Sequence, residues 1–424
     1  MSEIAKSAKR VHGQPAGCAV GTGGVPGGLL FSRQPVFGPD KELHAYALGF
    51  HAEASAVPDH GLAGPAALEL INSVGLDMFA GDADLLFPFD AASLSEKAYA
   101  LLPSERTILS VSLETLRDPS VLESLRSARS DGFRLALRSS VPVSQKLIGA
   151  LEPSILQTSA KLLIENPDWA GASPEQLGVR LLATQVDDHD IASKAQHAGA
   201  TLCSGTYYCL PETLKARPLV GSETVRLRLL TEIGKPTLDM EAIEAVFRSD
   251  IDLPCGLLRY INSAALGLRS RITSIRHALT LMGAEPMRRW CAVAAIGSIR
   301  ADAPAELIRT TLVRAKFCEN IGIQSGDADR SLDYFLVGLL STIEALLGIP
   351  AQDAIQGIPL HDDVRSTLMG QSGSVFSTAL EIVRACECGA WASVAANCTA
   401  FGLTHGETSV AFFDAVRWGA TCAP

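Results

Sequence analysis

Cysteine and serine are the first side chains whose chemistry the sequence invites. The chain has 10 cysteines, but the one close pair is Cys386-x-Cys388, and a zinc site needs a second pair or a nearby histidine. No G-x-S-x-G elbow stands between a strand and a helix, and neither Ser110 nor Ser139 has assignable histidine and aspartate partners. We therefore expect no nucleophilic serine, and reduced, mostly buried thiols as in a cytoplasmic protein.

Histidine could supply metal ligands. His277 lies between apolar positions of a helical stripe, where we expect a hydrogen-bonded histidine at a helix edge. The pair His361-Asp362 follows Pro359 and is typical of the polar start of a helix. His405 is alone in the sequence. These spacings predict no metal site and no cofactor.

The glycines near the N-terminus could suggest a phosphate-binding loop. They surround Pro26 within residues 1–28. A phosphate loop requires a strand before it and a helix after it, and neither pattern is present. We expect residues 1–28 to form a tail that buries no core.

Length and charge limit the classes of protein. At about 150 residues per domain, a chain of 424 residues predicts two or three domains. The net charge of −10 argues against a dedicated nucleic-acid binder or a protein that binds anionic membranes, because both normally carry a basic face. No apolar stretch is long enough to cross a membrane, and the N-terminus lacks the apolar region of a signal peptide. We expect no nucleic-acid partner and no membrane insertion.

Residues 29–215 read as strands that alternate with helices. Apolar residues alternate in Thr107–Leu113 and Phe133–Arg138, and Lys161–Glu165 and Val179–Leu182 are predicted as two more strands. Strand starts recur roughly every 20 to 30 residues, which is the period of a β/α barrel. A full barrel takes roughly 250 residues, so we expect a trimmed one.

Polar residues mark two helix starts in this region. Asp118 precedes Pro119, which fits an N-cap followed by a proline in the first turn. The acidic run from Asp187 to Asp190 also favours a helix N-terminus, where carboxylates face unpaired N–H groups.

Residues 220–424 show the helical period alone. Ile243, Val246 and Phe247 share one stripe, and Trp290–Ile299 is an apolar helix. A long stripe runs over 335–347 and stops at Gly348. We predict an all-α domain here, joined to the first near residues 211–224.

Three stretches resemble a known pairing of domains. The opening "FSRQPVFGPDKELHAYALGF" resembles the first strand of an EAL domain, the cyclic di-GMP phosphodiesterase barrel. The segments "LRYINSAALGLRSRITSIRHALTLMG" and "DYFLVGLLSTIEALLGIP" resemble the HDOD domain, a helical relative of the HD phosphohydrolases. Together they resemble the EAL–HDOD signal transduction proteins of bacteria over residues 30–424. The resemblance implies an α/β plus all-α fold: a trimmed TIM-like (β/α) barrel over 29–215, followed by an all-helical HDOD domain over 220–424.

The resemblance also implies a set of metal ligands in the barrel, which this sequence does not carry. The family's glutamates, asparagine and aspartate pair are replaced here at Ala47, Pro88, Ser110, Arg138, Ser139 and Thr184. His51 stands for the signature's terminal arginine, and Lys161 matches the family's base loosely. Hard divalent cations need oxygen ligands, mostly carboxylates. We therefore expect a degenerate EAL domain that binds no metal and is not an enzyme.

The predicted function is a non-catalytic signal transduction protein that contacts other signalling proteins, in cyclic di-GMP-related or other bacterial regulation. One alternative is a receptor that binds cyclic di-GMP without hydrolysis, and the second is a cyclic di-GMP phosphodiesterase. A basic concentration could contact an acidic protein or a phosphate, although a solvated helix face explains it too. It consists of Arg259, Arg269, Arg271, Arg276, Arg288 and Arg289.

Overall fold

The computed structural model describes residues 29–52, 65–167, 169, 174–212, 214, 219–250, 253, 257, 277, 281–297, 299–300 and 303–422. The chain divides into two compact units. One contains the described residues of 219–298, and the other contains the described residues of 25–218 and 299–424. We call them the small unit and the barrel unit. The barrel unit therefore contains helices from both halves of the sequence.

Eight strands close into a barrel in the order β1 to β8. The strands are β1 (Leu29–Phe37), β2 (Leu43–Ala52), β3 (Asp84–Pro88), β4 (Thr107–Ser112), β5 (Arg134–Arg138), β6 (Ile155–Ser159), β7 (Arg180–Thr184) and β8 (Leu202–Ser204). β1 runs antiparallel to both of its neighbours, β2 and β8, whereas the pairings from β2 to β8 are parallel. The predicted α/β barrel is confirmed.

Short helices explain how a closed barrel fits into so few residues. Those between the strands range from four residues in α7 to 12 in α4. They are α1 (Pro65–Val74), α2 (Leu76–Ala80), α3 (Ala91–Ser95), α4 (Pro119–Ser130), α5 (Gln145–Leu151), α6 (Ala160–Glu165), α7 (Pro174–Leu177) and α8 (His189–His197). The 3₁₀ turns are η1 (Ala98–Leu101), η2 (Ser104–Arg106), η3 (Thr115–Arg117) and η4 (Tyr207–Cys209), with η6 (Ala328–Arg330) later in the chain. The barrel is thus trimmed in its helices and keeps its strands.

One predicted strand is wrong. Lys161–Glu165 lies in helix α6, and the strand of this region is β6, which ends at Ser159. The Ser159 hydroxyl accepts a hydrogen bond from the N–H of Leu162 at 3.3 Å, as an N-cap does. A short apolar run is compatible with a buried strand or with a short buried helix. The N-cap hydrogen bond of Ser159 distinguishes the two.

The predicted helix starts are confirmed. The Asp118 carboxylate accepts from the N–H of Ser120 at 2.9 Å, and the Asp188 carboxylate accepts from the N–H of Ile191 at 2.7 Å. The acidic run therefore begins helix α8, and Asp188 is its N-cap.

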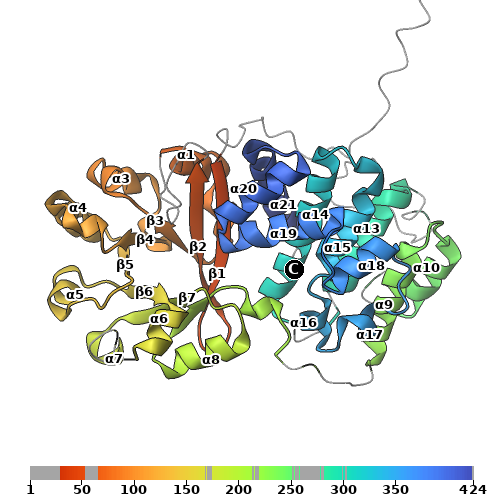
Figure 1. Ribbon diagram of the computed structural model, residues 1–424, viewed down its shortest axis with the longest axis horizontal. Helices are drawn as coiled ribbons and strands as arrows, with labels where there is room; N and C mark the ends of the chain where they lie inside the picture. Colours follow the sequence, from red (N-terminus) through yellow and green to blue (C-terminus); the bar gives the residue numbers. More distant parts are fainter. Residues whose placement is uncertain are drawn as a thin grey trace, which may run out of the picture. The chain divides into compact units, whose positions relative to one another are not determined.

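Helices from the C-terminal part of the chain complete the barrel unit. They are α14 (Ala305–Gln324), α15 (Ser331–Leu340), α16 (Ile343–Leu347), α17 (Ala351–Ile355), α18 (Asp362–Leu368), α19 (Val375–Cys388), α20 (Trp391–Phe401) and α21 (His405–Cys422). The predicted stripe over 335–347 is buried in α15 and α16, and Gly348 ends α16 with φ +67°. Both α19 and α21 pack against β1, as Figure 1 shows. The rings of Phe31 in β1 and Phe412 in α21 lie 4.7 Å apart.

The small unit contains α9 (Gly221–Gly234), α10 (Met240–Arg248) and α13 (Ala284–Gly297). The predicted stripe Ile243, Val246 and Phe247 in α10 is fully buried. The Arg226 guanidinium pairs with Asp250 at 2.8 Å inside this unit. The predicted all-α character of this region is confirmed for the residues described.

Among the residues that the structure describes, no helix combines the length and apolar character needed to cross a membrane.

Candidate functional site

Two layers of side chains fill the barrel. The deeper layer is an apolar cluster with one residue from each strand: Val36, Ala45, Leu86, Ile108, Ala136, Ile155, Leu182 and Leu202. Side chains of a strand alternate between its two faces, so the next residue to face the interior lies two positions further along. This second layer lies towards the carboxyl ends of β2 to β8, the end at which TIM barrels place their active sites. Its members, which we call the mouth ring, are Gln34, Ala47, Pro88, Ser110, Arg138, Gln157, Thr184 and Ser204.

The mouth ring brings together most of the positions singled out in the sequence. Ala47, Pro88, Ser110, Arg138 and Thr184 all belong to it. These five residues therefore share one layer of the barrel, and their match to the family's ligand positions stays a prediction.

Three other assignments lie outside the ring. Ser139 follows β5, and its hydroxyl donates to the carbonyl of Val141 at 2.6 Å, so it forms a local turn. Lys161 is exposed on α6. His51 lies near the end of β2, where its ring stacks on Trp391.

Sequence reasoning missed two members of the ring. Gln34 and Gln157 are polar residues inside otherwise apolar strands. The signal that could have found them is the two-residue period that links each of them to a buried apolar residue of the deeper layer.

The ring is polar and largely uncharged. The Ser110 hydroxyl donates to Oε1 of Gln157 at 3.3 Å, and the Thr184 hydroxyl donates to the carbonyl of Thr158 at 3.1 Å. The Ser204 hydroxyl is buried with no hydrogen-bond partner. Arg138 is the one charged residue of the ring. Ser204 therefore places an unpaired polar group inside the mouth. An unpaired buried hydroxyl costs free energy of folding.

Solvent reaches part of this layer. Gln34, Ala47, Arg138, Gln157 and Thr184 are partly exposed, whereas the deeper layer is buried. The mouth therefore combines an accessible polar layer with a closed apolar floor.

The ring does not fit a centre of two divalent cations. None of its members is a carboxylate or a histidine, and Arg138 brings a positive charge. Over the part of the chain that the structure describes, no three of the His, Cys, Asp and Glu side chains gather as a metal ion would require. Asp187 lies just beyond β7. Its pKa is raised mainly by burial and, to a lesser extent, by the charge of Asp188. We derive no chemical step through a metal.

A buried polar network holds β1 and β2 from outside the barrel. Glu306 of α14 accepts a hydrogen bond from the hydroxyl of Tyr46, and the Arg309 guanidinium donates to the same hydroxyl at 2.8 Å. The guanidinium carbon of Arg33 lies 3.6 Å from the centre of the Tyr46 ring. Burial raises the pKa of Tyr46, so the phenol stays protonated and can donate. Tyr46 precedes ring member Ala47, and Arg33 precedes Gln34.

The cysteines are not activated nucleophiles. The eight cysteines that the structure describes are free, and six of them are buried. Burial raises the pKa of both Cys203 and Cys209 to about 11. A thiol with a raised pKa is protonated and unreactive at neutral pH.

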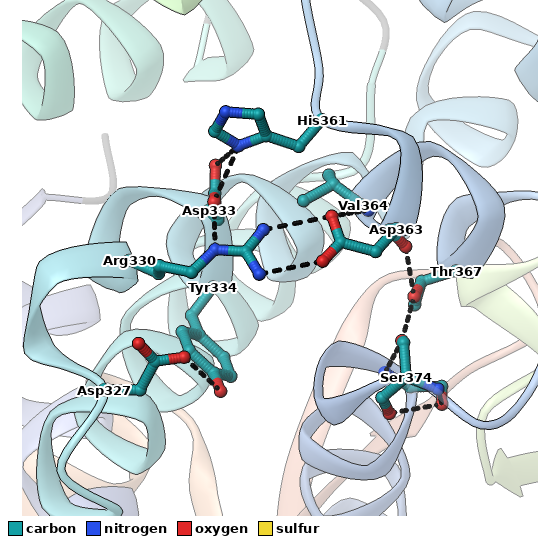
Figure 2. Close-up of polar contacts among 10 residues, drawn as sticks. Asp327, Arg330, Asp333, Tyr334, His361, Asp363, Val364, Thr367 and Ser374 are labelled. Atoms are coloured by element: carbon teal, nitrogen blue, oxygen red, sulfur yellow. Dashed lines mark hydrogen bonds and ion pairs between the residues drawn. The ribbon is translucent and has the colours of Figure 1, made fainter.

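The pair His361-Asp362 lies at a helix start, as expected, and Figure 2 shows its surroundings. Nδ1 of His361 lies 2.9 Å from the Asp333 carboxylate. The Arg330 guanidinium pairs with Asp363 at 2.8 and 3.0 Å and with Asp333 at 2.9 Å. The hydrogen bonds from Arg330 lower the pKa of Asp363. Because Arg330 engages both carboxylates, the cluster ties α15 to α18.

The predicted arginine patch is described at two positions. Arg259, Arg269, Arg271 and Arg276 lie outside the described residues. Arg288 is buried, and its guanidinium donates to the carbonyl of Pro236 at 3.0 Å, so it supports the small unit and is not part of a surface. Arg289 lies 3.8 Å from the carboxylate of Glu285. His277 is exposed in a helix.

Comparison with known proteins identifies the helical region. Residues 221–356 match the HDOD domain family. A Vibrio cholerae protein named cyclic di-GMP phosphodiesterase CdgJ is 26% identical over 396 residues, which are 91% of this chain and 91% of the relative. The Bacillus subtilis protein YuxH is 25% identical over 246 residues, or 57% of this chain and 59% of that one.

Several solved structures are similar to part of this chain, and some of them are named as EAL proteins. Klebsiella pneumoniae BlrP1 in a calcium and cyclic di-GMP complex is 14% identical with a TM-score of 0.34, over 42% of this chain and 54% of that one. An EAL domain protein from Listeria monocytogenes is 13% identical with a TM-score of 0.32, over 43% of this chain and 87% of that one.

The comparison corrects one prediction. The chain was expected not to be an enzyme, but a relative that aligns with 91% of it is named a phosphodiesterase. The expectation rested on the residues found at single ligand positions. The term degenerate rested on the same positions and has no support from the comparison. The closed barrel, the HDOD match over residues 221–356 and the similarity to CdgJ over 91% of the chain support an EAL–HDOD architecture.

Proposed function

We propose that this chain acts in cyclic di-GMP signalling by binding the dinucleotide at the mouth ring. The observation that carries the proposal is the ring itself, in which Arg138 stands among neutral hydrogen-bonding side chains at the carboxyl end of the barrel. Ligands of TIM barrels bind at this end. The relative CdgJ is named for cyclic di-GMP, which supports this choice of ligand.

The ring chemistry suits a cyclic dinucleotide. A guanidinium can pair with two phosphate oxygens at once, which makes arginine a preferred phosphate ligand. Ser110, Gln157 and Ser204 supply hydroxyl and amide groups, and the buried hydroxyl of Ser204 has no hydrogen-bond partner in the free protein.

Hydrolysis of cyclic di-GMP is the second candidate function, because the relative aligned with most of this chain is named a phosphodiesterase. Both candidate functions use the binding site at the mouth ring, where no metal ligands are identified. They differ in whether the bound dinucleotide is cleaved.

Protein partners and a cytoplasmic location are further parts of the proposal. The six buried thiols support the location.

Equilibrium binding of labelled cyclic di-GMP to the full chain tests the proposal. We expect Arg138→Gln to weaken binding at least about tenfold, since a charged hydrogen bond contributes about 1.5–3 kcal/mol. The matched control is Arg126→Gln, which removes an exposed arginine from α4 and should leave the affinity unchanged. The same samples with Mg²⁺ or Mn²⁺ report turnover to the linear dinucleotide. Absence of binding by the unmodified chain, or equal losses in both variants, would contradict a site at the ring.

A further inference from the structure

One side of the mouth ring is in contact with the end of helix α19. The Nε2 amide of Gln34 donates a hydrogen bond to the carbonyl oxygen of Glu387 at 3.0 Å. Gln34 is a ring member on β1, and Glu387 lies in the last turn of α19. Part of the ring's hydrogen-bonding capacity is therefore already used by a helix of the same unit.

An ion pair with α14 stabilises the end of α19 in this position. The Arg314 guanidinium on α14 donates to the Glu387 carboxylate through Nε at 2.8 Å and through Nη2 at 2.8 Å. The two side chains are 4% and 12% exposed. Paired charges so well removed from water fix the geometry of the partners.

The turn after α19 covers the next layer of the mouth. Ser32 of β1 pairs with Gly49 of β2, and both lie two residues beyond ring members. A Cβ atom at Gly49 would lie 2.6 Å from the Ser32 hydroxyl and 3.9 Å from the Trp391 ring. Gly389, with φ +69°, would place a Cβ 3.6 Å from the same ring. The glycines thus permit the tryptophan to lie close to the β1–β2 edge.

Trp391 closes the contact by stacking on His51. The two ring centres are 5.7 Å apart with an angle of 9° between the planes. Burial, and then the charge of His405, lower the pKa of His51, which favours the neutral imidazole in the stack. Figure 1 shows α19 and α20 alongside β1 and β2.

We propose that residues 387–391, the junction of α19 and α20, form a cap over the β1–β2 side of the mouth ring that a bound cyclic dinucleotide must displace. This inference rests on the proposed function. A ligand that uses Gln34 competes with the Glu387 carbonyl, and a ligand that enters over Gly49 meets Trp391. The apparent affinity is then reduced by the fraction of molecules in which the cap is closed. Ligand binding and cap opening are coupled in both directions.

The first test measures binding of cyclic di-GMP to the full chain with Trp391→Ala. Removing the stack favours the open cap, so we expect binding to be at least threefold tighter than in the unmodified chain. The control is Trp418→Ala, which removes a tryptophan that packs edge-on against Phe335 in the same unit and should not tighten binding. Unchanged or weaker binding by Trp391→Ala would overturn the competition between cap and ligand.

The second test needs no ligand. Ser32 is 5% exposed beneath the cap, so in a Ser32→Cys variant the rate of thiol labelling, measured on the peptide that contains it, reports cap opening. We expect Trp391→Ala to raise that rate at least tenfold and Trp418→Ala to leave it unchanged. Hydrogen exchange of residues 387–391 provides the same comparison without the new cysteine.

The two tests separate the two proposals. If neither the unmodified chain nor Trp391→Ala binds the dinucleotide, the proposed function fails, and labelling and exchange alone decide whether the cap exists. If binding occurs but labelling and exchange do not respond to Trp391→Ala, the cap is wrong and the proposed function stands.

Discussion

At the scale of single residues, the alternation of side chains between the two faces of a strand decides which residues lie in one layer of the barrel. The assignments of Ala47, Ser110 and Arg138 came from a resemblance, and the barrel places all three in one layer. Ser139 is adjacent to Arg138 in sequence, yet it forms a turn with Val141 because it lies beyond the end of the strand. An alignment supplies order along the chain, whereas the face of each residue requires the period of two and the exact end of the strand.

Ser204 provides a test at this scale. Its hydroxyl is buried without a partner, so Ser204→Ala removes a desolvated polar group and leaves little empty volume. We expect the free energy of unfolding to stay the same or rise by up to about 1 kcal/mol, while affinity for cyclic di-GMP falls. Chemical denaturation and equilibrium binding measure the two effects. A loss of stability above about 1 kcal/mol would show that the hydroxyl has a partner in the free protein.

At the scale of elements, caps were more informative than apolar runs. Asp118 is predicted as an N-cap, and the acidic run from Asp187 to Asp190 is predicted to begin a helix. Asp118 and Asp188 accept the backbone hydrogen bonds that these predictions require. The run Lys161–Glu165 was predicted as a strand and is a helix, because five residues are too few to distinguish a period of two from a period of 3.6. Ser159 is the N-cap that identifies this segment as a helix, but serine also occurs at the ends of strands.

The buried stripe of α15 leads to a prediction about helix packing. Leu340 is 2% exposed, so Leu340→Asp places an unpaired carboxylate inside the barrel unit. We expect a loss of more than about 4 kcal/mol, which unfolds a marginally stable protein. The control is Ile323→Asp at the end of α14, where the side chain is 45% exposed and the change should be small. Thermal melts followed by circular dichroism compare the variants, and a cooperative, unshifted transition for Leu340→Asp would contradict the packing.

At the scale of the whole molecule, the domain boundaries predicted from the sequence differ from the compact units of the structure. The predicted boundaries, a barrel at 29–215 and a helical domain at 220–424, follow the sequence. The compact units instead join residues 299–424 to the barrel, and the HDOD match at 221–356 spans both units. The change of period near residue 220 is visible in the sequence, but the contacts of α14, α19 and α21 with β1 are not. Those contacts depend on residues far apart in the chain, such as Tyr46 and Glu306.

This arrangement predicts that the barrel region is not stable by itself. In a fragment that ends at residue 218, Tyr46 loses Glu306 and Arg309, and Phe31 loses the Phe412 ring. The fragment would expose the outer faces of β1 and β2, which carry buried aromatic and charged groups in the full chain, and such a surface favours association. We expect the fragment to aggregate or to unfold at a clearly lower temperature than the full chain, measured by size-exclusion chromatography and calorimetry. Adding residues 299–424 as a separate chain should restore a soluble complex, because they supply the missing contacts. A monomeric fragment that melts cooperatively at the temperature of the full chain would instead support the sequence boundary as the physical one.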